Sequence, residues 1–168
     1  MSHSKEQKIF RQIRDIEYRI SDDAAQSCFD KCMLLKRDLS TLGYECRLMI
    51  GDFKWSQLDL PEYLMKNCKR DAERHVFLQV RLPEQAWQNL DPSADAKLKA
   101  IFKIEDWDGR GSTGLLMKVK RVRVYRPFSL PTRIAVAIKR VLQTDDPNTL
   151  FYHMVDEWFD EVRRQSAS

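Results

Sequence analysis

The stretch "HVFLQVRLPEQAWQNLD", residues 75–91, decides how the rest of the chain is interpreted. It holds two apolar runs separated by "PEQ", a pattern that predicts two antiparallel strands joined by a turn. If the turn centres near Glu84, the numbers of facing residues sum to about 168, and residue 77 faces Asp91. Because rows on adjacent strands lie about 5 Å apart, His75 and Asp91 are predicted to lie close together.

Upstream of this hairpin, the spacing of Cys28, Cys32, Leu35 and Leu39 predicts a helix that starts near Cys28 and ends before Gly43. The alternation in "YECRLMI", residues 44–50, then predicts a half-buried strand. Cys28 therefore lies where a polar segment becomes a helix. Unpaired N–H groups and the positive end of the helix dipole favour a thiolate at such a position.

A thiol, an imidazole and a carboxylate are the groups of a nucleophilic triad. In this interpretation Cys28 is the nucleophile, His75 the general base, and Asp91 the acid that holds the imidazole in the right tautomer. The backbone N–H of Cys28 could help to bind an oxyanion, with the side chain of Gln26 as a weaker candidate donor.

Two segments, "CFDKCMLLKRDLSTLGYECRLMI" and "HVFLQVRLPEQAWQNLDPS", together resemble the transglutaminase-like superfamily, a papain-related group of cysteine-nucleophile proteins. The shared features are a cysteine that leads a helix, an "LG" turn into a strand with an arginine, a strand that begins with histidine, and a tryptophan-containing strand that closes on "LDP". The resemblance covers residues 24–95. It departs from many members at "AAQSC", where they have a glycine shortly before the nucleophile.

The resemblance implies an α+β, papain-like fold in which the cysteine-led helix packs on an antiparallel sheet. It implies acyl transfer at a peptide or isopeptide-type amide, with Cys28, His75 and Asp91 in the roles given above. It places Trp87 in the surroundings of the acid, where this residue is a weak candidate for substrate contact. Protease, deamidase, crosslinking transferase and inactive relative all stay open, and no cofactor is implied.

The length of 168 residues with 43% hydrophobic residues fits one domain, with residues 96–168 adding a strand and C-terminal helices. We expect helices over residues 5–20, from near Pro131, and after "DDPN". No apolar run approaches the roughly 20 residues of a membrane span, and the charged start is unlike a secretory signal. Four cysteines are too few for a disulfide scaffold, so we expect a soluble cytoplasmic protein with reduced thiols.

The basic residues of the chain are concentrated in residues 110–143, which hold nine Lys and Arg and no Asp or Glu. Within this region, "LLMKVKRVRVYR" reads as a strand with a β-bulge at Lys120–Arg121, which would restore one buried face. The exposed bases of this strand suggest a second hypothesis, an inactive domain that binds an acidic partner or nucleic acid. Without aromatic residues placed to stack bases, nucleic acid is the less favoured partner. The candidate binding residues are Lys118, Lys120, Arg121 and Arg123.

A zinc site is a lesser alternative, because Cys28, Cys32, Cys68 and His75 could supply four ligands. However, C-x3-C within a helix matches the usual C-x2-C knuckle poorly, and a zinc site leaves the "WQNLDP" strand unexplained. Cys32 is expected to be a core residue one turn below Cys28, and Cys68 a surface thiol.

Overall fold

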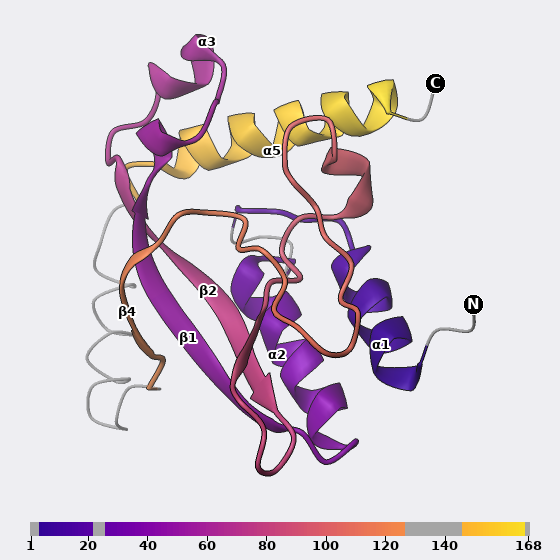
Figure 1. The fold of residues 1–168 in the computed structure, drawn as a ribbon. Coiled ribbons are helices and arrows are strands. Elements are labelled where there is room, and N and C mark those ends of the chain that lie inside the picture. The colour runs from indigo at the N-terminus through magenta and orange to yellow at the C-terminus, as the bar shows by residue number, and fades with distance from the viewer. Residues whose placement is uncertain (1–3, 22–25, 127–145, 167–168) are drawn as a thin grey trace.

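The computed structural model describes residues 4–21, 26–126 and 146–166, and its secondary structure is of the α+β class. The helices are α1 (Lys5–Arg14), α2 (Cys28–Ser40), α3 (Glu62–Met65) and α5 (Thr149–Gln165), with 3₁₀ turns η2 (Trp55–Gln57) and η3 (Ala96–Leu98). The strands are β1 (Glu45–Lys54), β2 (Ala72–Arg81), β3 (Gln88–Leu90) and β4 (Lys120–Val124). They form an antiparallel sheet in the order β3-β2-β1-β4 (Figure 1).

Helix α2 packs along β1 and β2, and α1 lies beside α2 (Figure 1). A first apolar cluster joins these elements, in which Cys32, Leu35 and Leu39 of α2 meet Leu48 and Leu78 of the sheet. A second cluster surrounds α5, whose Phe151, Val155 and Phe159 pack with Trp55, Leu64 and Leu98. Cys28 contacts both clusters, so the start of α2 lies where the two halves of the core meet.

The predicted helix over residues 5–20 is wrong in its second half, because α1 ends at Arg14. Beyond this point, tertiary partners bind the backbone groups that a helix would have paired internally. The carbonyls of Arg14 and Ile16 accept hydrogen bonds from Lys31, and the N–H of Tyr18 donates to Asp95. The isoleucine spacing therefore continues through residues that are not helical.

The predicted bulge in β4 is confirmed, but the buried face that it was expected to restore is not. Between the pairs Ile50–Arg123 and Asp52–Lys120, β4 has one more residue than β1, and Arg121 has a φ of 50°. The strand starts at Lys120 instead of Leu115, and Val122 and Val124 are 46% and 42% exposed. These valines are exposed because β4 is an edge strand that no described element covers.

Two further expectations concern the C-terminal part. The helix expected near Pro131 lies outside the described residues. The motif "DDPN" predicted an aspartate at the N-cap of the last helix. Helix α5 begins later than this, with Asn148 in the N-cap position. The Asn148 side chain does not cap the helix, because its amide instead bonds the backbone of Lys69 and Arg70.

Candidate active site

The hairpin of β2 and β3 places His75 and Asp91 in contact, in the register that the sequence predicted. Leu78 pairs with Leu90 and Val80 with Gln88, so facing residue numbers sum to 168. His75 Nε2 lies 2.7 Å from Asp91 Oδ2, and both side chains are 1% exposed. The predicted contact is therefore confirmed as a buried hydrogen bond.

Asp91 is held by four hydrogen bonds, which occupy both oxygens of its carboxylate. Oδ1 accepts from the backbone N–H of Ser93 and from its hydroxyl, at 3.1 and 2.6 Å. Oδ2 accepts from the backbone N–H of Leu116 at 2.7 Å in addition to His75. The N–H of Asp91 itself donates to the Thr113 hydroxyl. The carboxylate therefore has one fixed orientation, and it fixes the imidazole in turn.

This environment keeps both partners charged. Burial alone would lower the pKa of His75, but the adjacent Asp91 and, after it, Cys28 raise this pKa above its ordinary value. Burial would likewise raise the pKa of Asp91, but His75, Ser93 and the Leu116 N–H lower it. The favoured state is an imidazolium whose Nε2 donates to an ionised carboxylate.

Cys28 is the first residue of α2, as the sequence predicted, and it is partly buried. A capping box fixes this helix end: Ser27 accepts the N–H of Asp30, and the Asp30 carboxylate accepts the N–H and hydroxyl of Ser27. His75 Nδ1 is buried and has no hydrogen-bond partner among the described residues. Cys28 raises the pKa of His75, and the two residues line the same cavity.

A cavity of about 460 Å³ opens onto Cys28 and His75. Its walls come from distant parts of the chain, including Tyr18 before α2, Trp55 after β1 and Tyr152 on α5. Trp55 is 3% exposed, and its Nε1 is a buried donor without a hydrogen-bond partner in the described part of the chain. Because an unpaired buried donor costs about 1–3 kcal/mol, this N–H is a feature that a ligand could use.

Lys31 stabilises the site through hydrogen bonds to three backbone carbonyls. It is completely buried, and its ammonium donates to the carbonyls of Arg14, Ile16 and Ser93 at 2.6–2.8 Å. Burial lowers the pKa of Lys31 to about 8, although Asp95 and Asp91 oppose this shift. Because Lys31 lies three residues after Cys28, its hydrogen bonds join the start of α2 to the loop that carries Ser93.

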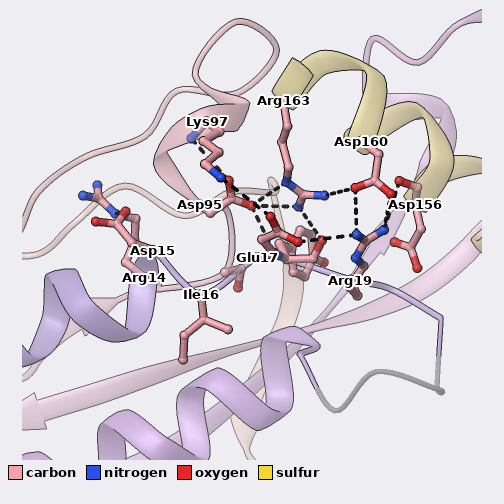
Figure 2. Close-up of polar contacts among 12 residues, drawn as sticks. Arg14, Asp15, Ile16, Glu17, Arg19, Asp95, Lys97, Asp156, Asp160 and Arg163 are labelled. Carbon is pink, nitrogen blue, oxygen red and sulfur yellow. Dashed lines mark hydrogen bonds and ion pairs between the residues drawn. The ribbon is translucent and has the colours of Figure 1, made fainter. Parts of the chain in front are cut away.

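A polar network fixes the segment before α2 to α5 (Figure 2). Arg163 of α5 donates to Asp95 Oδ2 at 2.8 Å and to the carbonyl of Tyr18 at 2.7 Å. Asp156 accepts from the N–H groups of Ile20 and Ser21. Tyr18, Ile20 and Ser21 all line the cavity, so this network forms its wall.

The remaining predicted residues lie in two other places. Gln26 immediately precedes the cap of α2 and is absent from the cavity lining, although Ser27 and Cys28 are part of it. The ring of Trp87 forms cation–π contacts with Arg47 and Arg81, whose guanidinium carbons lie 4.0 and 4.6 Å from its centroid, and it also lies outside the cavity.

The bases of the fourth strand are exposed, as expected. Lys118, Lys120, Arg121 and Arg123 all have exposed side chains. Lys120 and Arg121 line a second cavity, which adjoins the first. Arg123 forms an ion pair with Asp52.

The four ligands of the zinc hypothesis are not brought together. Within residues 4–21, 26–126 and 146–166, no group of three or more His, Cys, Asp or Glu side chains could hold a metal ion. Cys32 is fully buried, as predicted, and its thiol contacts the carbonyl of Val76. Cys68 is less exposed than expected, because it packs against the cluster around α5.

Sequence reasoning missed the residues that hold His75 and Asp91 in place or line the cavity. Lys31 lies in a helix that was predicted from the spacing of its apolar residues, and this spacing does not indicate a buried lysine. Trp55 lies in a stretch without periodicity. Thr113 and Leu116 belong to a glycine-rich segment that predicted only a loop. Ser93 and Asp95 follow Asp91 in "LDPSAD", and this run of short polar residues is the one local signal that could have indicated a hydrogen-bonded turn.

Comparison of the chain with protein-family models and with curated proteins finds no significant match to either. Among the described helices, none is long and apolar enough to span a bilayer.

Proposed function

We propose that this protein is a cysteine-nucleophile enzyme of papain-related, transglutaminase-like architecture that transfers the acyl group of a peptide or isopeptide-type amide. The observation that carries the proposal is the state of the His75 imidazole. Its Nε2 is bound to a fully hydrogen-bonded carboxylate, while its Nδ1 has no described partner in a cavity that it shares with Cys28. A structural histidine would be expected to use both nitrogens.

In the proposed reaction, the Cys28 thiolate attacks the amide carbonyl carbon, and the C=O electrons move onto oxygen. As the tetrahedral intermediate collapses, the C–N bond breaks and His75 Nδ1–H protonates the leaving amine. A thioester on Cys28 remains. His75 then removes a proton from the acceptor, which attacks the thioester and releases the thiolate. Water as acceptor gives a carboxylic acid, and an amine gives a new amide.

The oxyanion needs hydrogen-bond donors that are already in place. The backbone N–H of Cys28 lies in the first turn of α2, where N–H groups have no partner within the helix. The second donor that we propose is Trp55 Nε1, because the residue lines the cavity and its N–H is unpaired. Gln26, outside the cavity lining, is not proposed for this role.

Trapping the thioester tests the proposed function. The protein would be mixed with an activated acyl ester, quenched in acid and measured by intact-protein mass spectrometry. We expect one added acyl group on wild type, located at Cys28 by peptide mapping, and none on Cys28→Ala. Acyl transfer to Cys68, or to no residue, would contradict the proposal. Cys68→Ala is the matched control and should acylate like wild type.

A further inference from the structure

We infer that the amide substrate is acidic, and that a basic groove beside the cavity of Cys28 and His75 binds its carboxylates. This inference rests on the proposed function and adds the substrate class to it. The groove is a second cavity of about 690 Å³. It shares Phe53, Arg70, Glu73 and Arg74 with the lining of the first cavity, so the two cavities are neighbours.

Among the described residues, the lining of the groove carries more positive than negative charge. Its two acids are already occupied: Asp52 pairs with Arg123, and Glu73 pairs with Arg70 and accepts the Tyr152 hydroxyl. Four bases of its lining form no ion pair with any described carboxylate. They are Lys54, Arg74, Lys120 and Arg121.

The bulge in β4 explains why two consecutive bases of this strand line one cavity. In a regular strand Lys120 and Arg121 would point to opposite faces. The extra residue of β4 and the φ of 50° at Arg121 break this alternation, as a bulge does when it redirects a side chain. Both side chains therefore line the groove.

The groove lies close to His75, because Arg74 lines both cavities and His75 lines the first. Arg74 directly precedes His75 on β2, it pairs with Asp52 of β1, and Asp52 pairs with Lys120 of β4. This row crosses three strands, so it spans roughly 10 Å, the length of about three residues of extended peptide. Acidic residues within a few positions of the scissile amide would reach it.

Nucleic acid is a poorer occupant of the same groove. Single strands bind through aromatic rings that stack on bases. Phe53 is the aromatic residue of the described lining, and it is 5% exposed and packed in the core around α5. A groove that supplies cations without a stacking surface, beside a cavity lined by a thiol and an imidazole, suits an acidic peptide.

A matched pair of peptides tests the inference. One would carry Glu at the three positions on either side of the scissile amide, and the other Gln at the same positions. The protein variant is Lys120→Glu/Arg121→Glu. The control is Lys8→Glu/Lys99→Glu, which reverses the charge of two exposed residues outside both cavities. Binding to the Cys28→Ala forms is measured by fluorescence anisotropy, and turnover with intact Cys28.

We expect the Glu peptide to bind Cys28→Ala at least tenfold more tightly than the Gln peptide. The preference should weaken as salt rises, and it should be lost in Lys120→Glu/Arg121→Glu but kept in the control. Equal binding of the two peptides, or a preference that survives the double reversal, would overturn the inference. So would tighter binding of a single-stranded oligonucleotide that displaces the peptide.

The two proposals fail separately. If Cys28 forms the thioester but the peptides bind alike, the groove is wrong and the proposed function stands. If the Glu peptide binds in the groove but Cys28 never acylates, the proposed function is wrong, and the groove belongs to a non-catalytic acidic-partner site.

Discussion

The His75 imidazole shows how a buried titratable pair makes stability depend on pH. Its pKa is raised above the ordinary 6.5 to about 10, because the effects of Asp91 and Cys28 outweigh the opposing effect of burial. Since the folded protein holds this proton more tightly than the unfolded chain, the stabilisation is complete below about pH 6.5. It is lost as the pH rises toward the raised pKa.

We therefore expect wild type to lose stability relative to His75→Gln between about pH 6.5 and 10. Urea unfolding at intervals across this pH range measures the free energy of unfolding of both proteins. Taking the difference between them cancels the titration of groups that the two proteins share. A difference that is constant with pH, or that grows as the pH rises, would show that His75 is neutral in the folded protein.

Trp55 allows catalysis to be separated from packing. Its ring packs edge-on against Phe53 and Phe151, at centroid distances of 5.0 and 5.1 Å, and a phenyl ring can keep these contacts. Trp55→Phe removes an unpaired buried N–H, which offsets the lost contact area, so we expect the free energy of unfolding to change by less than about 1 kcal/mol. Turnover should fall tenfold or more. Unchanged turnover in a stable variant would exclude the indole as an oxyanion donor.

At the scale of the elements, Gly51 allows the segment before β4 to cross β1. A Cβ at this position would lie 2.6 Å from Val119 Cβ, closer than two packed carbon atoms can approach. We expect Gly51→Ala to destabilise the fold by about 1–3 kcal/mol through overpacking. Gly111→Ala is the control, because its Cβ would meet only the Asp108 carboxylate at 3.8 Å and should change stability little. Chemical denaturation measures both, and equal effects would contradict the steric explanation.

The accuracy of the sequence predictions differs between elements for physical reasons. The β2–β3 register followed from the strand pattern and the turn position alone, because alternating burial fixes which residues face each other. The start of α2 followed from apolar spacing. The end of α1 could not be predicted in this way, because it is set by partners that are distant in the sequence. The exposure of Val122 could not be predicted either, because it depends on whether another element covers β4. The residues that support Cys28, His75 and Asp91 were missed for the same reason, since Lys31 bonds to carbonyls that are remote from it in the sequence.

At the scale of the whole molecule, α5 holds in place the segment before α2, which forms one wall of the cavity. Arg163 is 5% exposed and joins Asp95 to the carbonyl of Tyr18 (Figure 2). Arg163→Ala leaves a buried carboxylate and a carbonyl without this partner, so we expect a loss of about 3–5 kcal/mol. Glu161→Ala, at an exposed position of the same helix, should cost less than about 0.5 kcal/mol. Thermal unfolding compares the two, and similar midpoints would contradict the role given to α5.

The central claim is that Cys28 and His75 form a thiolate–imidazolium pair, and the pH dependence of cysteine alkylation tests it most directly. Each cysteine would be labelled with iodoacetamide between about pH 5 and 9 and quantified by mass spectrometry, in wild type and in His75→Ala. An ordinary cysteine titrates near pH 8.5. We predict that Cys28 alone reacts rapidly at pH 5–6 and loses this advantage in His75→Ala. A Cys28 that is inert, or that labels with the same pH profile as Cys68, would contradict the account.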